Sequence, residues 1–164
     1  MTRVLPSPKI GSCANPMESG TRRPTQRGGE MNKGEFIHRV QAITGIPERD
    51  RAEKATSAVM GTLCGRLTRD EAKDLEAQLP NGIDSMCEGN ILTSLLKQVA
   101  GPNRLDRDAF LDRVAEKGDL EGRDQAAAVT TAVFRVVKDQ ISEGEAADVA
   151  QQLPAKLKVM WLES

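Results

Sequence analysis

The sequence contains an internal repeat, because residues 31–87 align without gaps with residues 105–161 when the chain is shifted by 74 positions, the shift that takes Phe36 to Phe110. The other matched pairs are Arg39 with Arg113, Val40 with Val114, Arg49-Asp50 with Arg123-Asp124, Ala52 with Ala126, Thr56 with Thr130, Ala58-Val59 with Ala132-Val133, Glu71-Ala72 with Glu145-Ala146, Asp74 with Asp148, Gln78-Leu79-Pro80 with Gln152-Leu153-Pro154, and Met86 with Met160. Matches in a single register predict two copies of one structural unit. We call them the first repeat (31–87) and the second repeat (105–161).

The first helix of each repeat is predicted from a capping residue and from apolar residues spaced three and four apart. Asn32 and Asp106 are both favourable N-cap residues. The apolar residues that we expect this helix to bury are Phe36, Val40 and Ile43 in the first repeat, and Phe110, Leu111 and Val114 in the second.

The second helix is predicted to be the longest of the three. Its apolar stripe comprises Ala52, Ala55, Val59, Met60, Leu63 and Leu67 in the first repeat, with Cys64 at its margin, and Ala126, Val129, Val133, Val136, Val137 and Ile141 in the second. The stretch 129–137, VTTAVFRVV, is rich in β-branched residues and would suit a strand. The aligned stretch 58–67, AVMGTLCGRL, would not, so we expect a helix in both repeats.

The third helix begins with a capping box in each repeat, Thr68-Arg-Asp-Glu71 and Ser142-Glu-Gly-Glu145. In such a box the hydroxyl accepts from a backbone N–H three residues on, and the glutamate accepts from the N-cap N–H. The helix is predicted to stop before Pro80 or Pro154, because proline cannot continue the ladder of hydrogen bonds. A short apolar tail then follows.

Residues 91–100, ILTSLLKQVA, are too apolar for a solvated tether and predict a linker helix. Aromatic residues make up only 2% of the chain, and a core of small aliphatic side chains suits packed helices better than a sheet. We therefore expect an all-α fold. In it, the two three-helix repeats and the linker helix pack about a pseudo-two-fold axis as one domain, 31–164.

Residues 1–30 differ in composition from the rest of the chain. They contain Pro6, Pro8, Pro16 and Pro24 and no apolar periodicity, which predicts a disordered leader. Arg27-Gly28-Gly29-Glu30 precedes Met31 directly, as a purine-rich ribosome-binding site would if it were translated in frame. One hypothesis is that Met31 is the initiator and that the leader is not part of the native protein. The alternative is a genuine flexible basic tail that docks on an acidic partner.

The motif combination in residues 31–162 resembles the bacterial family DUF2267, a domain of unknown function. Phe36-Ile-His-Arg-Val40, Arg66-Leu-Thr-Arg-Asp-Glu-Ala72 and Gln78-Leu-Pro80 carry the resemblance in the first repeat. Phe110-Leu-Asp-Arg-Val114 and Gln152-Leu-Pro154 carry it in the second. The resemblance implies a soluble all-α protein, and it implies no activity, cofactor or catalytic residue.

The distribution of charge and apolar residues excludes several functions. Residues 1–30 hold five basic and two acidic residues, a net charge of +3, which leaves 18 basic and 22 acidic residues, a net charge of −4, in residues 31–164. An acidic body does not attract nucleic acid or anionic lipid through its overall charge. No apolar run approaches the roughly 18–20 residues of a membrane span. Cys13, Cys64 and Cys87 lack metal-binding spacing, and we expect reduced thiols in a cytoplasmic protein.

The residues that could carry chemistry are better explained by structure. His38 is expected to face solvent, and Cys64 and Cys87 to be structural rather than nucleophilic. Asp106-Arg-Asp108 begins like a calcium loop, but Phe110 and Leu111 stand where that loop needs an oxygen ligand and a glycine. Asp70, Glu71, Asp74 and Glu76 suit a solvated helix N-terminus, and the recurring pairs Arg49-Asp50 and Arg123-Asp124 suit capping and local ion pairs. No catalytic, cofactor or metal site is predicted.

Three functional hypotheses follow. The preferred one is a non-enzymatic protein-interaction module, in which the groove between the repeats binds a partner helix or a second copy of the chain. The alternative is a small-molecule-binding protein or enzyme with a pocket at the interface between the repeats. The third is nucleic-acid binding through residues 1–30.

Overall fold

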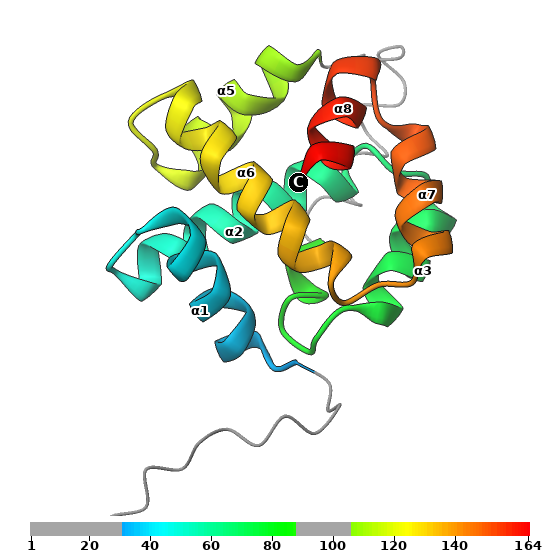
Figure 1. The fold of residues 1–164 in the computed structure, drawn as a ribbon, viewed down its shortest axis with the longest axis horizontal. Coiled ribbons are helices and arrows are strands. Elements are labelled where there is room, and N and C mark those ends of the chain that lie inside the picture. Colours follow the sequence, from blue (N-terminus) through cyan, green and yellow to red (C-terminus); the bar gives the residue numbers. More distant parts are fainter. Residues whose placement is uncertain (1–30, 88–105) are drawn as a thin grey trace, which may run out of the picture.

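The structure is a computed structural model that describes residues 31–87 and 106–164. These residues form helices α1 (Lys33–Thr44), α2 (Arg49–Cys64), α3 (Arg69–Gln78), α5 (Arg107–Gly118), α6 (Arg123–Lys138), α7 (Glu143–Gln152) and α8 (Ala155–Glu163) (Figure 1). No strand occurs within the described ranges, so the prediction of an all-α fold is confirmed. The predicted linker helix 91–100 and the leader 1–30 lie outside the described residues.

The helix bounds in the two repeats differ by the same shift as the sequence. Helices α1, α2 and α3 begin and end 74 residues before α5, α6 and α7. The stretch 129–137 lies inside α6, as the aligned stretch in α2 predicted, although its β-branched residues would suit a strand. Both long helices end three residues before the last members of their predicted stripes, Leu67 and Ile141, which are nevertheless buried.

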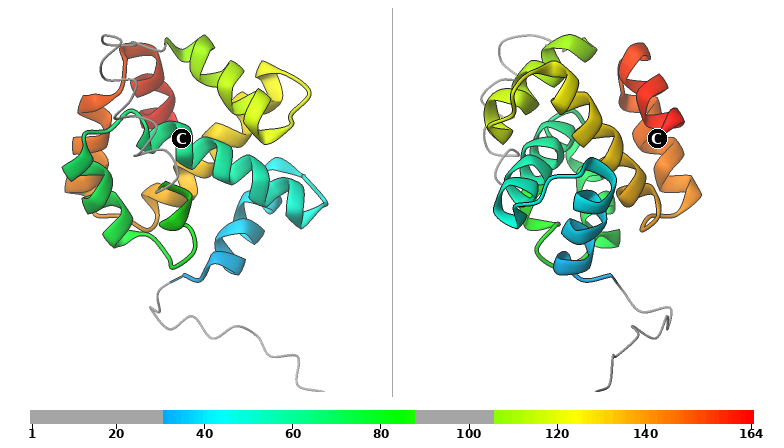
Figure 2. Two further views of the ribbon diagram at one scale, coloured as in Figure 1. Left: turned by 180° about the vertical axis from the view of Figure 1, so that it is seen from behind. Right: turned by 60° about the vertical axis from the view of Figure 1, so that its left-hand side comes forward.

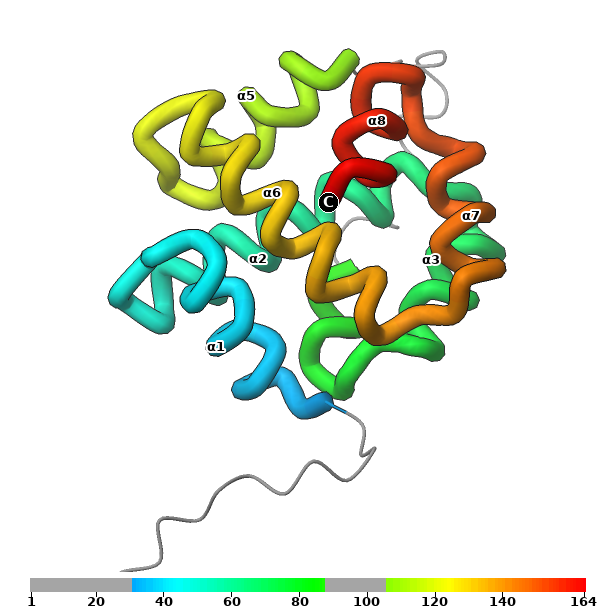
Figure 3. The backbone as a smooth tube through the Cα atoms, in the orientation of Figure 1, coloured from blue at the N-terminus to red at the C-terminus, as the bar shows by residue number. Residues whose placement is uncertain are grey.

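The packing joins the two repeats rather than separating them. The long helices α2 and α6 lie at the centre, with α1 and α5 on one side and α3, α7 and α8 on the other (Figure 1). Helix α2 packs most extensively on α5, and α1 packs on α6, as the chain path in Figure 3 shows. At Gly118 a Cβ would stand 3.3 Å from the Cα of Ala55, so a small residue permits the close approach of α5 to α2. One apolar core spans both repeats and includes Phe36, Phe110, Phe134 and Trp161.

Ile43 differs from the sequence prediction, because its side chain is 48% exposed instead of buried. Helix α1 buries Phe36, Ile37 and Val40. Ile43 lies in the last turn of α1, which no neighbouring helix of the described residues covers. Its equivalent in the last turn of α5, Lys117, is also exposed. Periodicity places Ile43 on the apolar side of the helix but cannot tell where the covering helix ends.

The capping residues were predicted correctly, but the second half of each capping box was not. The hydroxyls of Thr68 and Ser142 accept from the backbone N–H of Glu71 and Glu145, at 3.4 and 3.2 Å. The glutamates do not accept from the N-cap N–H groups in return. Instead the N–H of Thr68 donates to Gln152 Oε1, and the N–H of Ser142 donates to Gln78 Oε1, each at 2.8 Å. The last residue of each helix therefore caps the first turn of the other, because α3 packs against α7.

The tails of the two repeats are attached in different ways. In the second repeat the tail is helix α8. There Trp161 packs edge to face on Phe134, with ring centroids 4.9 Å apart, and Lys138 Nζ donates to the carbonyl oxygens of Trp161 and Ser164 at 2.9 and 2.7 Å. In the first repeat, the residues equivalent to Lys138 and Trp161 are Cys64 and Cys87. Those two residues form a disulfide with a Cα–Cα distance of 5.4 Å.

The prediction of reduced thiols is therefore wrong for Cys64 and Cys87, while Cys13 lies outside the described residues. The two cysteines are separated by 23 positions and match no short motif, so only the fold of the tail against the end of α2 brings them within bonding distance. Disulfides are typical of oxidising compartments. The prediction of a cytoplasmic location consequently loses the support that it drew from the cysteines.

Candidate functional site

An open pocket of about 590 Å³ lies beside α2. Its lining residues come from the start of α1, the first half of α2, the tail of the first repeat and the end of α5. The left panel of Figure 2 shows the course of these four segments. The lining residues are Lys33, Asp50, Glu53, Lys54, Ser57, Ala58, Gly82, Ser85, Met86 and Lys117. The volume falls in the range of small-molecule sites, about 300–1,000 Å³.

The spacing of residues on α2 creates one long wall. Asp50, Glu53, Lys54, Ser57 and Ala58 recur every three or four residues and therefore share one face of the helix. This wall is charged at its N-terminal end and apolar at Ala58.

Gly82 in the opposite wall permits a close contact with Lys33. Its φ of +91° is a conformation that side chains rarely adopt, and a Cβ there would stand 2.9 Å from the Cδ of Lys33. The ammonium group of Lys33 forms an ion pair with Glu53. The side chain of Lys33 thus runs between the tail of the first repeat and α2.

Positive charge in the pocket comes from both repeats. Lys33 and Lys54 belong to the first repeat and Lys117 to the second. Lys54 pairs with Asp119 over 3.4 Å, but both side chains are more than half exposed, and such surface pairs contribute only about 0–1 kcal/mol. A stronger anion could therefore displace Asp119 from Lys54.

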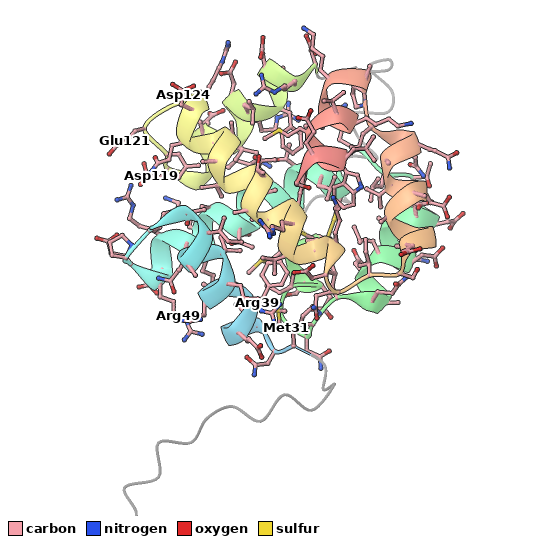
Figure 4. The ribbon with its side chains drawn as sticks, viewed as in Figure 1. Met31, Arg39, Arg49, Asp119, Glu121 and Asp124 are labelled. Carbon is pink, nitrogen blue, oxygen red and sulfur yellow. A yellow bond between two sulfur atoms is a disulfide. The ribbon has the colours of Figure 1, made fainter. Side chains whose placement is uncertain are left out.

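Negative charge gathers just beyond the pocket. Asp119, Glu121 and Asp124 lie together where α5 turns into α6, whereas Arg49 lies at the start of α2 (Figure 4). Arg123 forms a two-bond ion pair with Asp112, which lies 11 positions earlier on α5. This pair holds the pKa of Asp112 below and that of Arg123 above its usual range. In the first repeat, Arg49 is the equivalent of Arg123 and His38 is the equivalent of Asp112. Arg49 therefore has no carboxylate at the position from which Asp112 pairs with Arg123. The N-cap residues of α2 and α6 are Glu48 and Gly122, so the predicted capping by Arg49-Asp50 and Arg123-Asp124 is not found.

The residues considered for catalysis lie elsewhere. His38 is exposed on α1, as predicted, and does not line the pocket. Cys64 and Cys87 are buried and bonded to each other, so neither is a free nucleophile. Asp106 caps α5 and pairs with Lys156 at 3.3 Å. Within 31–87 and 106–164 no group of three or more histidine, cysteine, aspartate or glutamate side chains could hold a metal ion.

Acidic side chains of α3 and α7 face one another where these two helices pack antiparallel. Burial raises the pKa of Glu145 above its ordinary value, and the charges of Glu71, Asp74 and Asp148 act in the same direction, while a hydrogen bond from Gln78 opposes them. Burial likewise raises the pKa of Glu71. Glu145 is 9% exposed, and its Oε1 atom has no hydrogen-bond partner among the described residues. Of the four carboxylates predicted to form a solvated face, Asp70 and Asp74 are exposed, whereas Glu71 and Glu76 are half-buried.

Replacement of Glu145 by glutamine is expected to raise the melting temperature at pH 7 by about 2–4 °C. The native state disfavours the ionised carboxylate, so the contribution of Glu145 to stability is most favourable below the ordinary pKa value of 4.5. Stability then falls as the pH rises from 4.5 through the native pKa. The gain in the variant should disappear below pH 4.5 in thermal unfolding followed by circular dichroism.

Glu143→Gln provides the matched control, because Glu143 is exposed in the same turn of α7. That variant should show no gain at pH 7, since an exposed acidic residue at a helix start is slightly stabilising. A gain in Glu145→Gln that is the same at pH 4 and pH 7 would contradict the electrostatic cause.

The pocket was not identified from the sequence, although the alignment of the repeats contained a signal. Glu53 and Lys54 stand opposite Ala127 and Ala128 in the second repeat, so one face of α2 is charged where α6 has small apolar residues. A difference of this kind between two copies marks a position that the shared fold does not require. The contribution of Lys117 could not be found, because it depends on the packing of α5 against α2.

The comparisons with known proteins identify a family but no activity. The sequence model of the family DUF2267, described as an uncharacterized conserved protein, matches residues 33–162. No curated protein matches the chain. None of the helices in the described ranges is long and apolar enough to cross a membrane.

Proposed function

The chain belongs to the DUF2267 family of uncharacterized conserved proteins, and we propose that it is a non-enzymatic protein that binds a small anionic molecule in the pocket beside α2. The observation that carries this proposal is that Lys33, Lys54 and Lys117, from three different helices, line one concavity. The alternative hypothesis expected a pocket at the interface between the repeats, whereas this pocket is lined mainly by the first repeat and takes Lys117 from the second.

The composition of the lining supports an anionic ligand. The lining contains three lysines and two carboxylates, Asp50 and Glu53, an excess of one positive charge that Asp119 offsets from just outside the pocket through its exposed pair with Lys54. The hydroxyls of Ser57 and Ser85 add neutral donors, and Met86 and Ala58 offer a limited apolar surface. A small molecule with a phosphate or several carboxylates matches this set, since lysine binds such groups as a point charge.

The shape of the pocket favours binding over catalysis. It is open to solvent, while enzymes commonly exclude water from the reacting groups. No histidine or free cysteine of the described chain lines it. The groups present can hold an anion and orient it, and they form no nucleophile and base pair of the usual kind.

The domain organisation is part of the proposal. We infer that 31–87 and 105–161 are two copies of one unit, related by an approximate two-fold axis within a single domain, 31–164. The common shift of 74 positions and the exchanged hydrogen bonds of Gln78 and Gln152 support it. On the opposite side Lys33 and Asp50 are matched by Arg107 and Asp124, whereas Glu53, Lys54 and Lys117 are matched by Ala127, Ala128 and Ile43, so the charges of the pocket are repeated there only in part.

Isothermal titration of the full chain with pyrophosphate and with citrate tests the proposed function. We expect at least one of them to bind, whereas sodium chloride at the same ionic strength produces no binding heat. Lys54→Met should weaken binding about tenfold, since a hydrogen bond to a charged group contributes about 1.5–3 kcal/mol. Lys73→Met, an exposed lysine of α3 outside the pocket, is the matched control. Absence of binding by both anions at millimolar concentration, or equal weakening by both variants, would refute the site.

The protein-interaction module remains the second candidate function, and one observation favours it. Ile43 and Val159, exposed by 48% and 51%, occupy the positions equivalent to the pocket residues Lys117 and Ser85. Leu162, 62% exposed, follows Val159 by one helical turn. The side opposite the pocket is thus apolar at these positions. Light scattering on the full chain shows whether this apolar surface binds a second copy of the chain. A strict monomer would count against a second copy as the partner.

A further inference from the structure

We propose that the Cys64–Cys87 disulfide regulates the pocket by holding one of its walls in place, so that reduction of this bond lowers the affinity for the ligand. The inference rests on the proposed function, because it concerns the regulation of the same pocket. It is carried by the position of the bond, by the weak attachment of the wall, and by a comparison of the two repeats.

The disulfide joins the two elements that form opposite walls. Cys64 is the last residue of α2, the helix that supplies Asp50 to Ala58. Cys87 directly follows Ser85 and Met86, which line the pocket together with Gly82. The bond therefore ties the wall at 82–86 to the helix that it faces.

The wall segment has few other attachments to the body. Its hydrogen bonds to described residues are local and reach no further than Pro80, whose carbonyl accepts from Ile83 N–H and Asp84 N–H at 2.9 and 3.3 Å. Gly82 N–H and Ser85 N–H donate to Asp84 Oδ1 at 2.6 and 2.7 Å, and Cys87 N–H donates to the Asp84 carbonyl at 2.9 Å. Ile83 is fully buried and supplies an apolar anchor. The disulfide is the second anchor, at the other end of the wall.

The second repeat uses the same two positions for an attachment that no reductant can break. Lys138 occupies the position of Cys64 and Trp161 that of Cys87, and the lysine ammonium donates to the Trp161 carbonyl. Both repeats thus fasten the end of the long helix to the tail. In the repeat that forms the pocket, this attachment is a bond that a reductant can break.

The chemistry of release requires a dithiol as reductant. One thiolate attacks a sulfur of the disulfide, the mixed disulfide is resolved by the second thiol, and two electrons and two protons pass to Cys64 and Cys87, which become thiols while the reductant becomes a disulfide. Both cysteines are at most 3% exposed, so attack follows a local opening of the tail.

Release lowers affinity because a loosened wall must be ordered again when the ligand binds. Ordering even one or two backbone residues is costly, so we expect about a tenfold loss of affinity on reduction. We expect the rest of the protein to keep its fold, because Cys64 and Cys87 are only two of the many residues of the shared core and α2 packs most extensively on α5.

Titration of pyrophosphate into the oxidised full chain, into the chain reduced by dithiothreitol, and into the Cys64→Ala/Cys87→Ala variant tests the proposal. The expected result is about tenfold weaker binding in the last two samples, together with faster amide hydrogen exchange in residues 81–87 and unchanged exchange in α6. Lys138→Met is the matched control, since it loosens the equivalent attachment away from the pocket, and its affinity should stay that of the oxidised wild type.

The outcomes separate this inference from the proposed function. Equal affinity in the oxidised and reduced chains would overturn the regulation and leave the anion site standing. Absence of binding in every sample would overturn both. In that case the hydrogen exchange of residues 81–87 would still show whether the disulfide holds the wall. Unchanged exchange on reduction would independently overturn the claim that it does. Far-ultraviolet circular dichroism identical to that of the wild type confirms that the double variant folds.

Discussion

Replacement of Trp161 by alanine is expected to lower the free energy of unfolding by about 4 kcal/mol, the largest effect of any single substitution considered for this protein. The Trp161 side chain is 1% exposed and packs edge to face on Phe134. Its Nε1–H also donates to the carbonyl oxygen of Ala146 at 3.0 Å. The residue therefore connects α8 to both α6 and α7, and its loss leaves a cavity at the point where the three helices meet.

Two further variants separate the contributions of Trp161. Trp161→Phe keeps most of the apolar contact but loses the hydrogen bond, and it should cost about half as much or less. Leu162→Ala alters the neighbouring residue, which is 62% exposed, and should change stability by no more than about 0.5 kcal/mol.

Urea unfolding followed by circular dichroism measures these variants, since Trp161 is the only tryptophan and its fluorescence is lost with it. In the wild type its emission should be that of a buried indole and should shift to longer wavelength on unfolding. A loss below 1 kcal/mol in Trp161→Ala would show that α8 does not depend on this contact.

Removal of the Cys64–Cys87 disulfide is expected to cost about 3 kcal/mol, the second largest effect. The cysteines are 23 positions apart, and closing a loop of that length restricts the unfolded chain by about this amount. Urea midpoints of the oxidised chain, the reduced chain and Cys64→Ala/Cys87→Ala measure the loss. The reduced chain and the double variant should agree closely if the cross-link itself is the cause.

Two variants serve as comparisons for the disulfide. Cys13→Ser leaves both bonded cysteines in place and should keep the oxidised midpoint. Lys138→Met removes the equivalent attachment in the second repeat and should cost less, about 1–2 kcal/mol, because it removes two hydrogen bonds from a charged group and restricts no loop of the unfolded chain. A reduced chain as stable as the oxidised one would contradict the assigned role of the bond.

The agreement between sequence and structure is best where the two repeats can be compared. The stretch 129–137 alone would suit a strand, and its alignment with 58–67 correctly predicted a helix. Asn32, Thr68 and Ser142 were recognised as caps because a cap needs only residues next to it in the chain. Local interactions of this kind leave a local pattern, so one sequence is enough to find them.

The differences arise where a residue depends on a partner far along the chain. Gln78 was seen only as part of a helix end, yet its side chain accepts from the N–H of Ser142, 64 positions away. Ile43 lies on the apolar side of α1 but beyond the reach of the helix that covers Val40. Neither outcome could be found from spacing, because spacing describes one helix and not its neighbours.

The all-α class, the long helices α2 and α6 and the helix ends before Pro80 and Pro154 could be predicted from the amino-acid pattern alone. Helix formation depends on hydrogen bonds between residues four apart and on capping groups within one turn, so these properties are encoded locally. The packing of the helices was needed to show that Cys64 meets Cys87, that Lys117 joins Lys54 at one pocket, and that Gln78 and Gln152 exchange caps. Those contacts join positions 23 to 84 residues apart. The disulfide forms because the tail of the first repeat folds back on the end of α2, and the other contacts form because the apolar faces of the two repeats pack against each other.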